Sequence, residues 1–215
     1  MNFKMAIGAA VSSIMMASAA AAATLSISGG DYGALPGNHN PDYSGLGAYA
    51  PVPTIGVGDV VARFGDGFAS AIAGNGLTIS SKSTVKITFL GTEAGATNTA
   101  LNLAGGVLNN KTSAKGDRIY ADDLPTFIDF AFATIKGGGV ETITNGVGQT
   151  DPDLSIAFYL EDSENALAFF GDGRGDSDFD DMVVRISVVP LPAGGVLLLT
   201  ALGGMAVARR RKKAA

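Results

Sequence analysis

The chain has 215 residues, a formal net charge of −5 and no cysteine. Without cysteine it has neither disulfide bonds nor thiolate ligands, so its fold must be stabilised by an apolar core or by bound ions. All 20 acidic residues but only 9 of the 15 basic residues lie between Thr24 and Val189, which gives this segment a net charge of −11. Because nucleic-acid phosphates require a basic surface, we expect no nucleic-acid partner.

The first 23 residues have the pattern of a secretory signal peptide. Lys4 precedes an apolar run from Met5 to Ala22, and the small residues Ala21 and Ala23 come before a predicted cleavage site at Thr24. The alternative is an uncleaved N-terminal anchor. Together with the C-terminal segment described below, the signal peptide predicts that residues 24–188 form one secreted acidic domain, long enough for a single hydrophobic core.

Apolar and polar residues alternate in several short segments that are separated by glycine-rich turns. The strongest example is Thr84–Leu90, in which Val85, Ile87 and Phe89 would point to one face of a strand. The other predicted strands are Thr24–Ser28, Val60–Phe64, Leu77–Ser80, Phe127–Ile135, Leu154–Leu160, Ala166–Phe170 and Met182–Val188. Short alternating strands of this kind predict an all-β fold, an antiparallel β-sandwich that is jelly-roll-like.

Two longer segments lack this alternation. Residues 29–58 are rich in glycine, proline, tyrosine and asparagine, and we interpret them as a long loop or as a flap that covers the domain. They contain the only histidine of the chain, His39, which lies among asparagine and aspartate residues. We therefore predict a solvated loop residue rather than a metal ligand or a base. Residues 94–106 are predicted to form a short helical turn or a loop.

The segment Gly171–Asp181 carries five aspartates against one arginine. In an extended segment the even-numbered aspartates would all point to one side, and the glycines of the loop would let it curl around an ion. Carboxylate oxygens are the ligands that Ca²⁺ prefers, although the glycine and glutamate positions of an EF-hand are missing here. The predicted calcium ligands are Asp172, Asp176, Asp178, Asp180 and Asp181. The alternative is a solvated acidic hairpin loop that binds no ion.

No combination of residues predicts a catalytic site. Glu161, Asp162 and Glu164 could form the carboxylate pair of a glycosidase, which needs two carboxyl groups about 5–9 Å apart across a cleft. The chain has no tryptophan to serve as a sugar platform, so we interpret these three residues as surface acids. We therefore expect no enzymatic activity.

The chain ends in residues 189–215, a segment of three parts. They are the pentapeptide Val189-Pro190-Leu191-Pro192-Ala193, an uncharged stretch over residues 193–208 and a basic tail over residues 209–213. The prolines end any preceding strand. A helix of this length would measure roughly 24 Å, short of the ~30 Å hydrocarbon core, and snorkelling basic side chains would close the gap. We predict one transmembrane helix with its basic tail in the cytoplasm. The alternative is a buried amphipathic helix followed by a solvated tail.

This tail resembles the sorting signals of the PEP-CTERM group, specifically the VPLPA-CTERM variant. The resemblance rests on Val189, Pro190, Leu191, Pro192 and Ala193, followed by the apolar stretch and the basic end. It implies recognition by an exosortase, a transpeptidase-like enzyme embedded in the membrane, and cleavage near the pentapeptide. It also implies delivery from the inner membrane to the envelope or surface of a polysaccharide-producing Gram-negative bacterium.

A second resemblance covers residues 85–189. The segments Thr88–Asn98 and Asp176–Val184, the latter with the pattern Asp-x-Asp-x-Asp-Asp-x-Val-Val, look like a domain of unknown function in secreted, C-terminally sorted bacterial proteins. This resemblance implies a β-sandwich with an aspartate-rich hairpin as its signature, and it implies no established activity. It makes Glu93 and Asn98 candidate structural members of the signature.

These features together predict an exported, non-enzymatic protein of the cell envelope or extracellular matrix. We expect a structural or adhesive role in the polysaccharide surface layer, with exosortase as processing partner and exopolysaccharide as a possible ligand. The alternative function is a calcium-dependent carbohydrate-binding module, since β-sandwiches with surface calcium often hold glycans.

Overall fold

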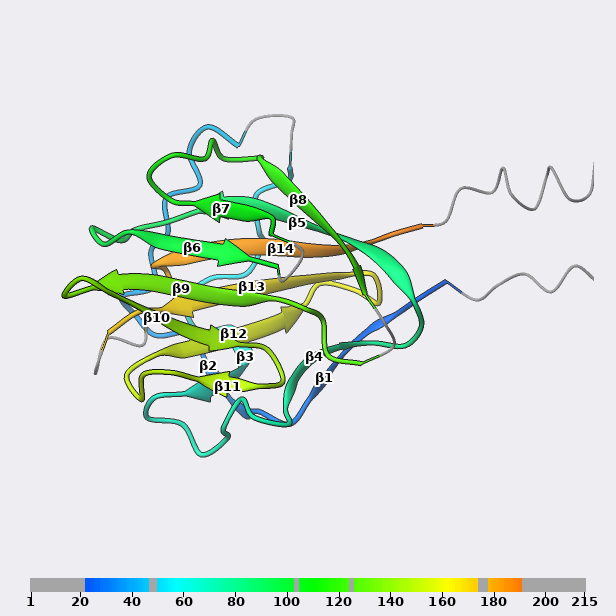
Figure 1. Ribbon diagram of the computed structural model, residues 1–215, viewed down its shortest axis with the longest axis horizontal. Coiled ribbons are helices and arrows are strands. Elements are labelled where there is room, and N and C mark those ends of the chain that lie inside the picture. The colour runs from blue at the N-terminus through cyan, green and yellow to red at the C-terminus, as the bar shows by residue number, and fades with distance from the viewer. Residues whose placement is uncertain (1–21, 47–49, 103–104, 124–125, 174–177, 191–215) are drawn as a thin grey trace, which may run out of the picture. The chain divides into compact units, whose positions relative to one another are not determined.

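The structure, a computed structural model, describes residues 22–46, 50–102, 105–123, 126–173 and 178–190 (Figure 1). These residues form fourteen β-strands in antiparallel sheets and contain no helix, which confirms the predicted all-β class. Accordingly, the described part of the chain has no helix that is long and apolar enough to cross a membrane. The predicted signal-peptide and transmembrane helices lie outside the described residues.

The strands form two large sheets and one small one. The seven-stranded sheet has the order β2 (Asp31–Ala34), β3 (Val60–Gly65), β12 (Ser155–Leu160), β13 (Asn165–Gly171), β14 (Met182–Val189), β5 (Ser83–Gly91) and β8 (Arg118–Asp123). The five-stranded sheet has the order β11 (Gly148–Gln149), β10 (Gly139–Thr144), β9 (Ala131–Lys136), β6 (Asn98–Leu101) and β7 (Val107–Asn109). Strands β1 (Leu25–Ser28) and β4 (Gly76–Ile79) pair with each other.

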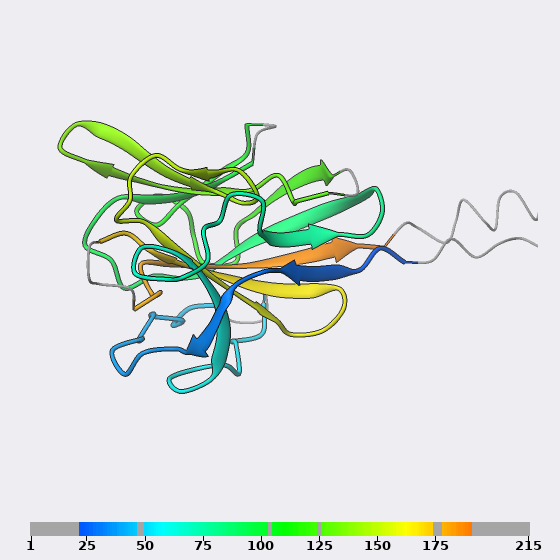
Figure 2. The ribbon, with the colours of Figure 1, turned by 90° about the horizontal axis from the view of Figure 1, so that it is seen from below.

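The two large sheets lie face to face, and the main apolar core fills the space between them (Figure 2). Phe132 of β9 stacks on Phe170 of β13 with the ring centroids 4.9 Å apart. In β5, Val85, Ile87 and Phe89 all belong to this core and are at most 1 % exposed, as the alternation predicted. Burial of side chains of this size stabilises the fold by roughly 1.5–3 kcal/mol each. The arrangement is consistent with a β-sandwich.

The opposite face of the seven-stranded sheet is also covered, by a flap that we define as residues 35–46 and 50–58. A second apolar cluster joins flap and sheet, and it includes Leu35, Leu46, Ala50 and Ile55 of the flap and Leu90, Leu167, Phe169, Phe179 and Val183 beneath it. Strands β13 and β14 are therefore buried on both faces, which explains the consecutive apolar residues Ala166–Phe170 of β13 and Met182–Val184 of β14. Of residues 29–58, which were expected to form a long loop or a covering flap, Asp31–Ala34 form strand β2 of the sheet, and the described residues after Ala34 cover it.

Several strands differ from the predicted set. Residues 94–106 contain β6 instead of the expected short helical turn or loop, and strands β2, β7, β8, β10 and β11 were not predicted. Most of these are short and rich in glycine, threonine or asparagine, so they carry little apolar alternation. The strand expected over Phe127–Ile135 begins only at Ala131, because Ile128 donates its N–H to the carbonyl of Leu77 in β4 and not to the five-stranded sheet.

Asn145 joins β4 to the end of β10 through buried hydrogen bonds. Its Oδ1 accepts the N–H of Leu77 at 2.8 Å, and its Nδ2 donates to the carbonyls of Leu77 at 2.7 Å and Ile128 at 2.8 Å. The side chain is 3 % exposed, so water cannot replace it. Asn145 thus supplies the backbone groups of two segments with the partners that a neighbouring strand would otherwise provide.

We predict that the substitution Asn145→Ala lowers the free energy of unfolding by about 2–4 kcal/mol, because it removes the partner of the Leu77 N–H and of the Ile128 carbonyl, and one of the two hydrogen bonds to the Leu77 carbonyl. Urea denaturation followed by circular dichroism measures this loss. The matched control is Asn75→Ala, since the Asn75 amide donates to Ala71 in an exposed turn. The control should cost less than about 1 kcal/mol. Equal losses in the two variants would contradict the role assigned to Asn145.

Candidate metal centre

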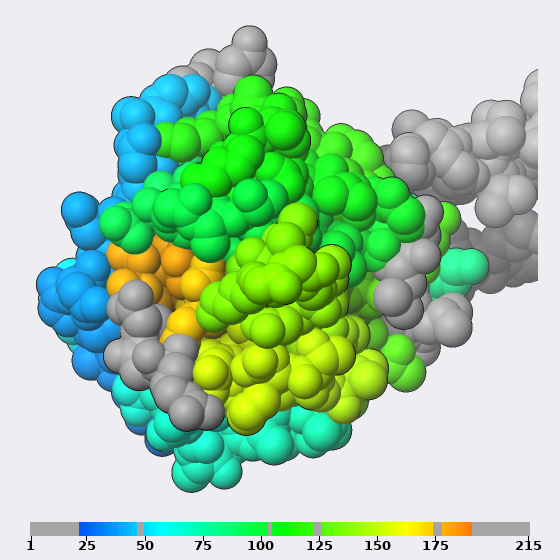
Figure 3. Space-filling view, turned by 60° about the vertical axis from the view of Figure 1, so that its left-hand side comes forward, coloured from blue at the N-terminus to red at the C-terminus, as the bar shows by residue number. Residues whose placement is uncertain are grey.

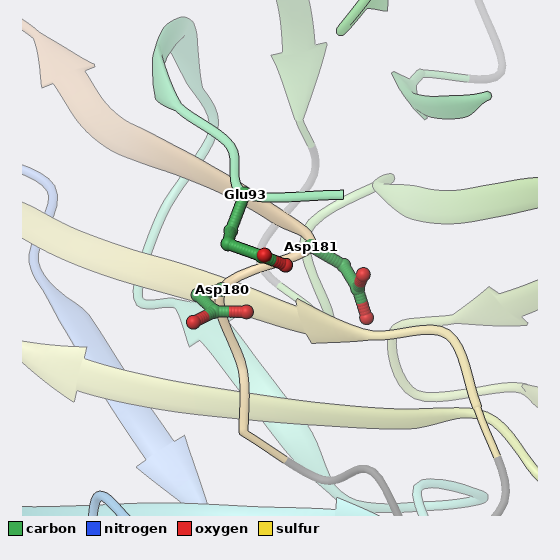
Figure 4. A group of neighbouring side chains, drawn as sticks. All are labelled: Glu93, Asp180 and Asp181. Atoms are coloured by element: carbon green, nitrogen blue, oxygen red, sulfur yellow. The ribbon is translucent and has the colours of Figure 1, made fainter. Parts of the chain in front are cut away.

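Three carboxylates converge where the turn after β5 meets the segment before β14 (Figure 4). Glu93, Asp180 and Asp181 each contribute one carboxylate oxygen, and these oxygens all lie within 4.8 Å of one another. Asp180 is 1 % exposed and Asp181 is 9 % exposed, whereas Glu93 is open to solvent. Three negative groups this close repel one another unless protons or a cation neutralise them. This group, which we name the carboxylate cluster, could therefore hold a metal ion.

Hydrogen bonds between the two segments fix the backbone around the cluster. Glu93 donates its N–H to the carbonyl of Asp180 at 2.8 Å, and the hydroxyl of Thr92 donates to the carbonyl of Asp181 at 2.6 Å. The ladder between β14 and β5 shifts register between Val183 and Val184, which is a bulge next to the cluster. Regular pairing of β14 with β5 thus ends beside the cluster. Beyond it, the bonds of Glu93 and Thr92 to the carbonyls of Asp180 and Asp181 hold the two segments together.

Phe179 turns the chain immediately before the two aspartates. Among the described residues it is the only non-glycine residue with a positive φ, 62°, a conformation that costs on the order of 1 kcal/mol. Its ring is 1 % exposed and stacks on Phe68 with the centroids 5.5 Å apart, so its burial offsets that cost. Because of this turn, the adjacent residues Asp180 and Asp181 both reach the cluster, and not the alternate aspartates of an extended segment.

The carboxylate of Asp180 has one satisfied and one unsatisfied oxygen. Its Oδ2 accepts the backbone N–H of Asn40 at 2.6 Å. Its Oδ1 is fully buried and has no hydrogen-bond partner among the described residues. A buried carboxylate oxygen without a donor loses its hydration and gains nothing in return, so it normally marks the position of a cation, a proton or a water molecule. This oxygen is an observation independent of the clustering of charges, and it indicates a ligand.

The cluster contains only some of the predicted calcium ligands. Asp181 is held by the N–H of Asp172, which donates to its Oδ2 at 2.7 Å. Asp172 itself binds elsewhere, because its Oδ2 accepts from Asn98 at 2.7 Å and Lys136 donates to its carbonyl. Asp178 accepts the Asn38 amide at 3.2 Å. Neither Asp172 nor Asp178 belongs to the cluster, and Asp176 lies outside the described residues. The third carboxylate is Glu93, which lies far from the aspartate loop in the sequence.

Asn98 connects the aspartate loop to the five-stranded sheet. Its side chain is completely buried, and its Nδ2 donates to Asp172 at 2.7 Å and to the carbonyl of Asp181 at 3.4 Å. Glu93 and Asn98 were both expected from the resemblance to be structural members of the hairpin signature. The structure places both against the hairpin, and it makes Glu93 a potential ligand as well.

His39 is not a solvated loop residue, so this prediction was wrong. The ring is 6 % exposed, lies edge-on to Phe169 with centroids 5.5 Å apart, and has its Nδ1 2.8 Å from the carbonyl of Asp178. A carbonyl can only accept, so Nδ1 carries the proton. Burial lowers the pKa of His39, while the bond to Asp178 and the charge of Asp180 oppose this shift. The polar neighbours that suggested solvation instead bind the aspartate loop.

The acidic residues after β12 have structural partners of their own. Glu161 is not a simple surface acid: it receives two hydrogen bonds from Arg185, at 2.6 and 2.7 Å, and Arg185 also donates to the carbonyl of Pro51 in the flap at 2.9 Å. Asp162 accepts backbone N–H groups from Glu164 and Asn165, and the first of these lowers its pKa most. Glu161 thus anchors the flap, and Asp162 shapes the β12–β13 turn.

The predicted processing sites lie at the two ends of the described fold. Thr24 donates its backbone N–H to the hydroxyl of Ser80 at 2.9 Å, and Ala23 is buried next to the core. At the other end, Val189 is the last residue of β14 and pairs with Thr84. Pro190 follows, while Ala21 and the remaining motif residues Leu191, Pro192 and Ala193 lie outside the described residues.

Two of the hollows on the described surface are lined by residues outside the cluster. The larger of the two, about 600 Å³, is lined by uncharged residues: Gly65, Phe68, Ala69, Ala71, Ile72, Ala73, Gly148, Gln149, Thr150 and Pro152. The smaller, about 250 Å³, is lined by residues 126–129 and 144–147, with Asp129 as its one acidic group. Neither hollow brings together the two carboxyl groups that glycoside hydrolysis needs.

We predict that His39 makes stability fall as the pH is lowered below about 6.5, the ordinary histidine pKa. Because its pKa is lowered only in the folded state, the unfolded chain binds the proton first, and the free energy of unfolding falls by at most about 1.4 kcal/mol per pH unit between the unfolded and folded pKa values. Urea denaturation in excess EDTA between pH 8 and 5 measures this slope. His39→Asn keeps the Nδ donor and cannot titrate, so its profile should be flatter. Parallel profiles would refute the prediction.

No protein-family model, no curated protein and no solved structure matches this chain. The function must therefore be argued from the residues and from the geometry of the cluster.

Proposed function

We propose that the described domain is the non-enzymatic body of an exported cell-envelope protein, and that a calcium ion held by the carboxylate cluster stabilises it. The observation that carries the proposal is the buried, unpartnered Oδ1 of Asp180 beside two further carboxylates. The sorting signal that the sequence predicts supports a structural or adhesive role in the polysaccharide surface layer.

The donor set favours calcium over softer metals. All three donors are carboxylate oxygens, and the chain has no cysteine. Ligand oxygens lie ~2.3–2.6 Å from Ca²⁺, so oxygens on opposite sides of one ion are about 5 Å apart. The spread of 4.8 Å within the cluster is compatible with a single central ion. Water and backbone carbonyls would complete its coordination from the exposed side of Glu93, as in extracellular calcium modules that bind in the ~10⁻⁴–10⁻³ M range.

The ends of the fold support the proposed export and sorting. Strand β14 stops at Val189, and Pro190 has no N–H with which to continue a ladder. A sorting tail that begins at this point could be cut without removing a strand. We further propose that the signal helix and the C-terminal transmembrane helix form as the sequence predicts, and that the sandwich is jelly-roll-like because the chain crosses between the two large sheets repeatedly.

We predict that the mature protein begins at Thr24 and ends near Val189–Ala193. Mass spectrometry of the protein from a polysaccharide-producing Gram-negative host that has an exosortase identifies both ends. In the same host, replacement of Pro190 and Pro192 by alanine should leave the N-terminal cleavage intact and abolish the C-terminal one. Full-length, unprocessed chain dissolved in the cytosol would contradict both export and sorting.

We predict that calcium raises the free energy of unfolding, by about 2.7 kcal/mol when its concentration is 100 times the Kd. Thermal melting and isothermal titration with CaCl₂ measure this effect. Glu93→Gln and Asp180→Asn should reduce it strongly, because each removes one charged ligand. Glu164→Gln is the matched control, because Glu164 lies at the end of β13 that is remote from the cluster. The opposite end of β13 leads into Asp172, which donates its N–H to Asp181 of the cluster. Absence of calcium heat with unchanged melting in chelator would refute the site.

The same protein tests the alternative function, a calcium-dependent carbohydrate-binding module. If the domain binds immobilised exopolysaccharide saturably and releases it in EDTA, the module replaces the structural role. If binding is absent, or is indifferent to calcium, the structural role stands.

A further inference from the structure

The segment His39–Asp42 of the flap is bonded to Asp180 of the carboxylate cluster and to two residues, Asp178 and Thr92, that lie next to or close to cluster residues in the chain. Asn40 donates its N–H to Asp180 at 2.6 Å, and His39 donates to the carbonyl of Asp178 at 2.8 Å. One step along the flap, Asp42 donates its N–H to the carbonyl of Thr92 at 3.2 Å, next to Glu93. Figure 3 shows this junction on the surface, where the orange segment around residue 180 reaches the surface between the blue flap region and the green region.

The fit between the flap and β5 is close. An added Cβ on Gly91 would lie 2.5 Å from the carbonyl oxygen of Asp42, nearer than van der Waals contact allows. Glycine at this position therefore lets the flap backbone lie directly against the end of β5. Lys115 binds the Asp42 carboxylate at 2.6 Å from the other side. The flap thus has one well-defined docked position at the cluster.

The carboxylate of Asp180 takes part both in holding the flap and in the proposed cation site. Its Oδ2 holds the flap through Asn40, while its Oδ1 is the unpartnered oxygen of the cluster. Without a cation, repulsion from Glu93 and Asp181 favours movement of the Asp180 carboxylate away from them, and such movement weakens the bond to Asn40. With a cation, the carboxylate is neutralised and held in place. Cation binding and flap docking must then favour each other.

We propose that a divalent cation at the carboxylate cluster acts as the clasp that locks the flap over the seven-stranded sheet. This proposal rests on the calcium site proposed above and adds its regulatory consequence. When the clasp is open, Leu167, Phe169 and Val183 lose their apolar cover, because the flap residues of the second cluster no longer lie over them. For an exported chain, surroundings in which calcium exceeds the ~10⁻⁴–10⁻³ M Kd range of extracellular modules would close the flap after export.

Hydrogen–deuterium exchange of the full-length chain in detergent micelles, with CaCl₂ or with EDTA, tests the clasp. Calcium should slow exchange of the Asn40 and Leu46 amides at least tenfold and leave the central amides of β9 unchanged. Isothermal titration with CaCl₂ on the same samples reports binding separately. Glu93→Gln, a substitution at an exposed side chain that the fold should tolerate, should weaken calcium binding and leave the flap amides exchanging fast at the same calcium concentration.

Because coupling is reciprocal, loosening the flap must weaken calcium binding. Leu46→Ala removes a flap anchor that is 1 % exposed and touches no carboxylate of the cluster. It should raise the calcium Kd by several-fold. The matched control Leu108→Ala removes an equally buried leucine from β7 in the main core and should leave the Kd unchanged.

The outcomes separate the two proposals. Calcium binding with unchanged flap exchange, or an unchanged Kd in Leu46→Ala, would overturn the clasp and leave the calcium site in place. Absence of any calcium binding would overturn both. Calcium-dependent flap protection that Glu93→Gln abolishes and Leu108→Ala retains would establish the clasp.

Discussion

The structure depends on the two-sided burial of β13 and β14. One face of these strands meets the five-stranded sheet, and the other would expose Leu167, Phe169 and Val183 to water if nothing covered it. The flap covers this face, together with Phe68 and Phe179 of the same apolar cluster. A glycine- and proline-rich segment has little intrinsic order, so its ordering must be stabilised by contacts at defined points. Apolar anchors supply most of this energy, and polar contacts with the 178–181 segment and with Arg185 fix its position.

The site follows from the same constraint. To reach the flap, the chain before β14 turns at Phe179, whose buried ring offsets the strained backbone. That turn brings Asp180 under the flap and Asp181 toward Asp172, so the two carboxylates serve different neighbours and still meet Glu93. Three carboxylates this close repel one another, and solubility alone does not require such an arrangement. They lie where the flap, the turn after β5 and the segment before β14 meet, so a cation bound there would link the three segments.

The sequence predicted the sandwich strands well where apolar alternation was strong, as in β5, because a period of two indicates a face directly. It predicted most strands of the five-stranded sheet poorly, since Asn98–Leu101 and Gly139–Thr144 carry mostly small and polar residues whose pairing is decided by their neighbours. The aspartate loop indicated an ion site, but Glu93 could not be found from spacing, because only the β14–β5 pairing brings it there. The prediction that His39 is solvated failed for a related reason. Neighbouring asparagine and aspartate residues indicate solvent exposure only when the fold offers them no buried hydrogen-bond partner, and here the aspartate loop provides such partners.

A cation at this junction would replace what a disulfide does in other exported domains, by a different mechanism. A disulfide restricts the unfolded chain and acts wherever the protein is. A cation that binds only the folded state contributes in proportion to the logarithm of its concentration, so stability depends on the surroundings. The chain has no cysteine, and the carboxylate cluster with its bond to Asn40 connects residues near positions 40, 92 and 180, which are widely separated in sequence. With the proposed cation, an acidic, cysteine-free domain would gain a long-range cross-link that forms only where divalent cations are abundant.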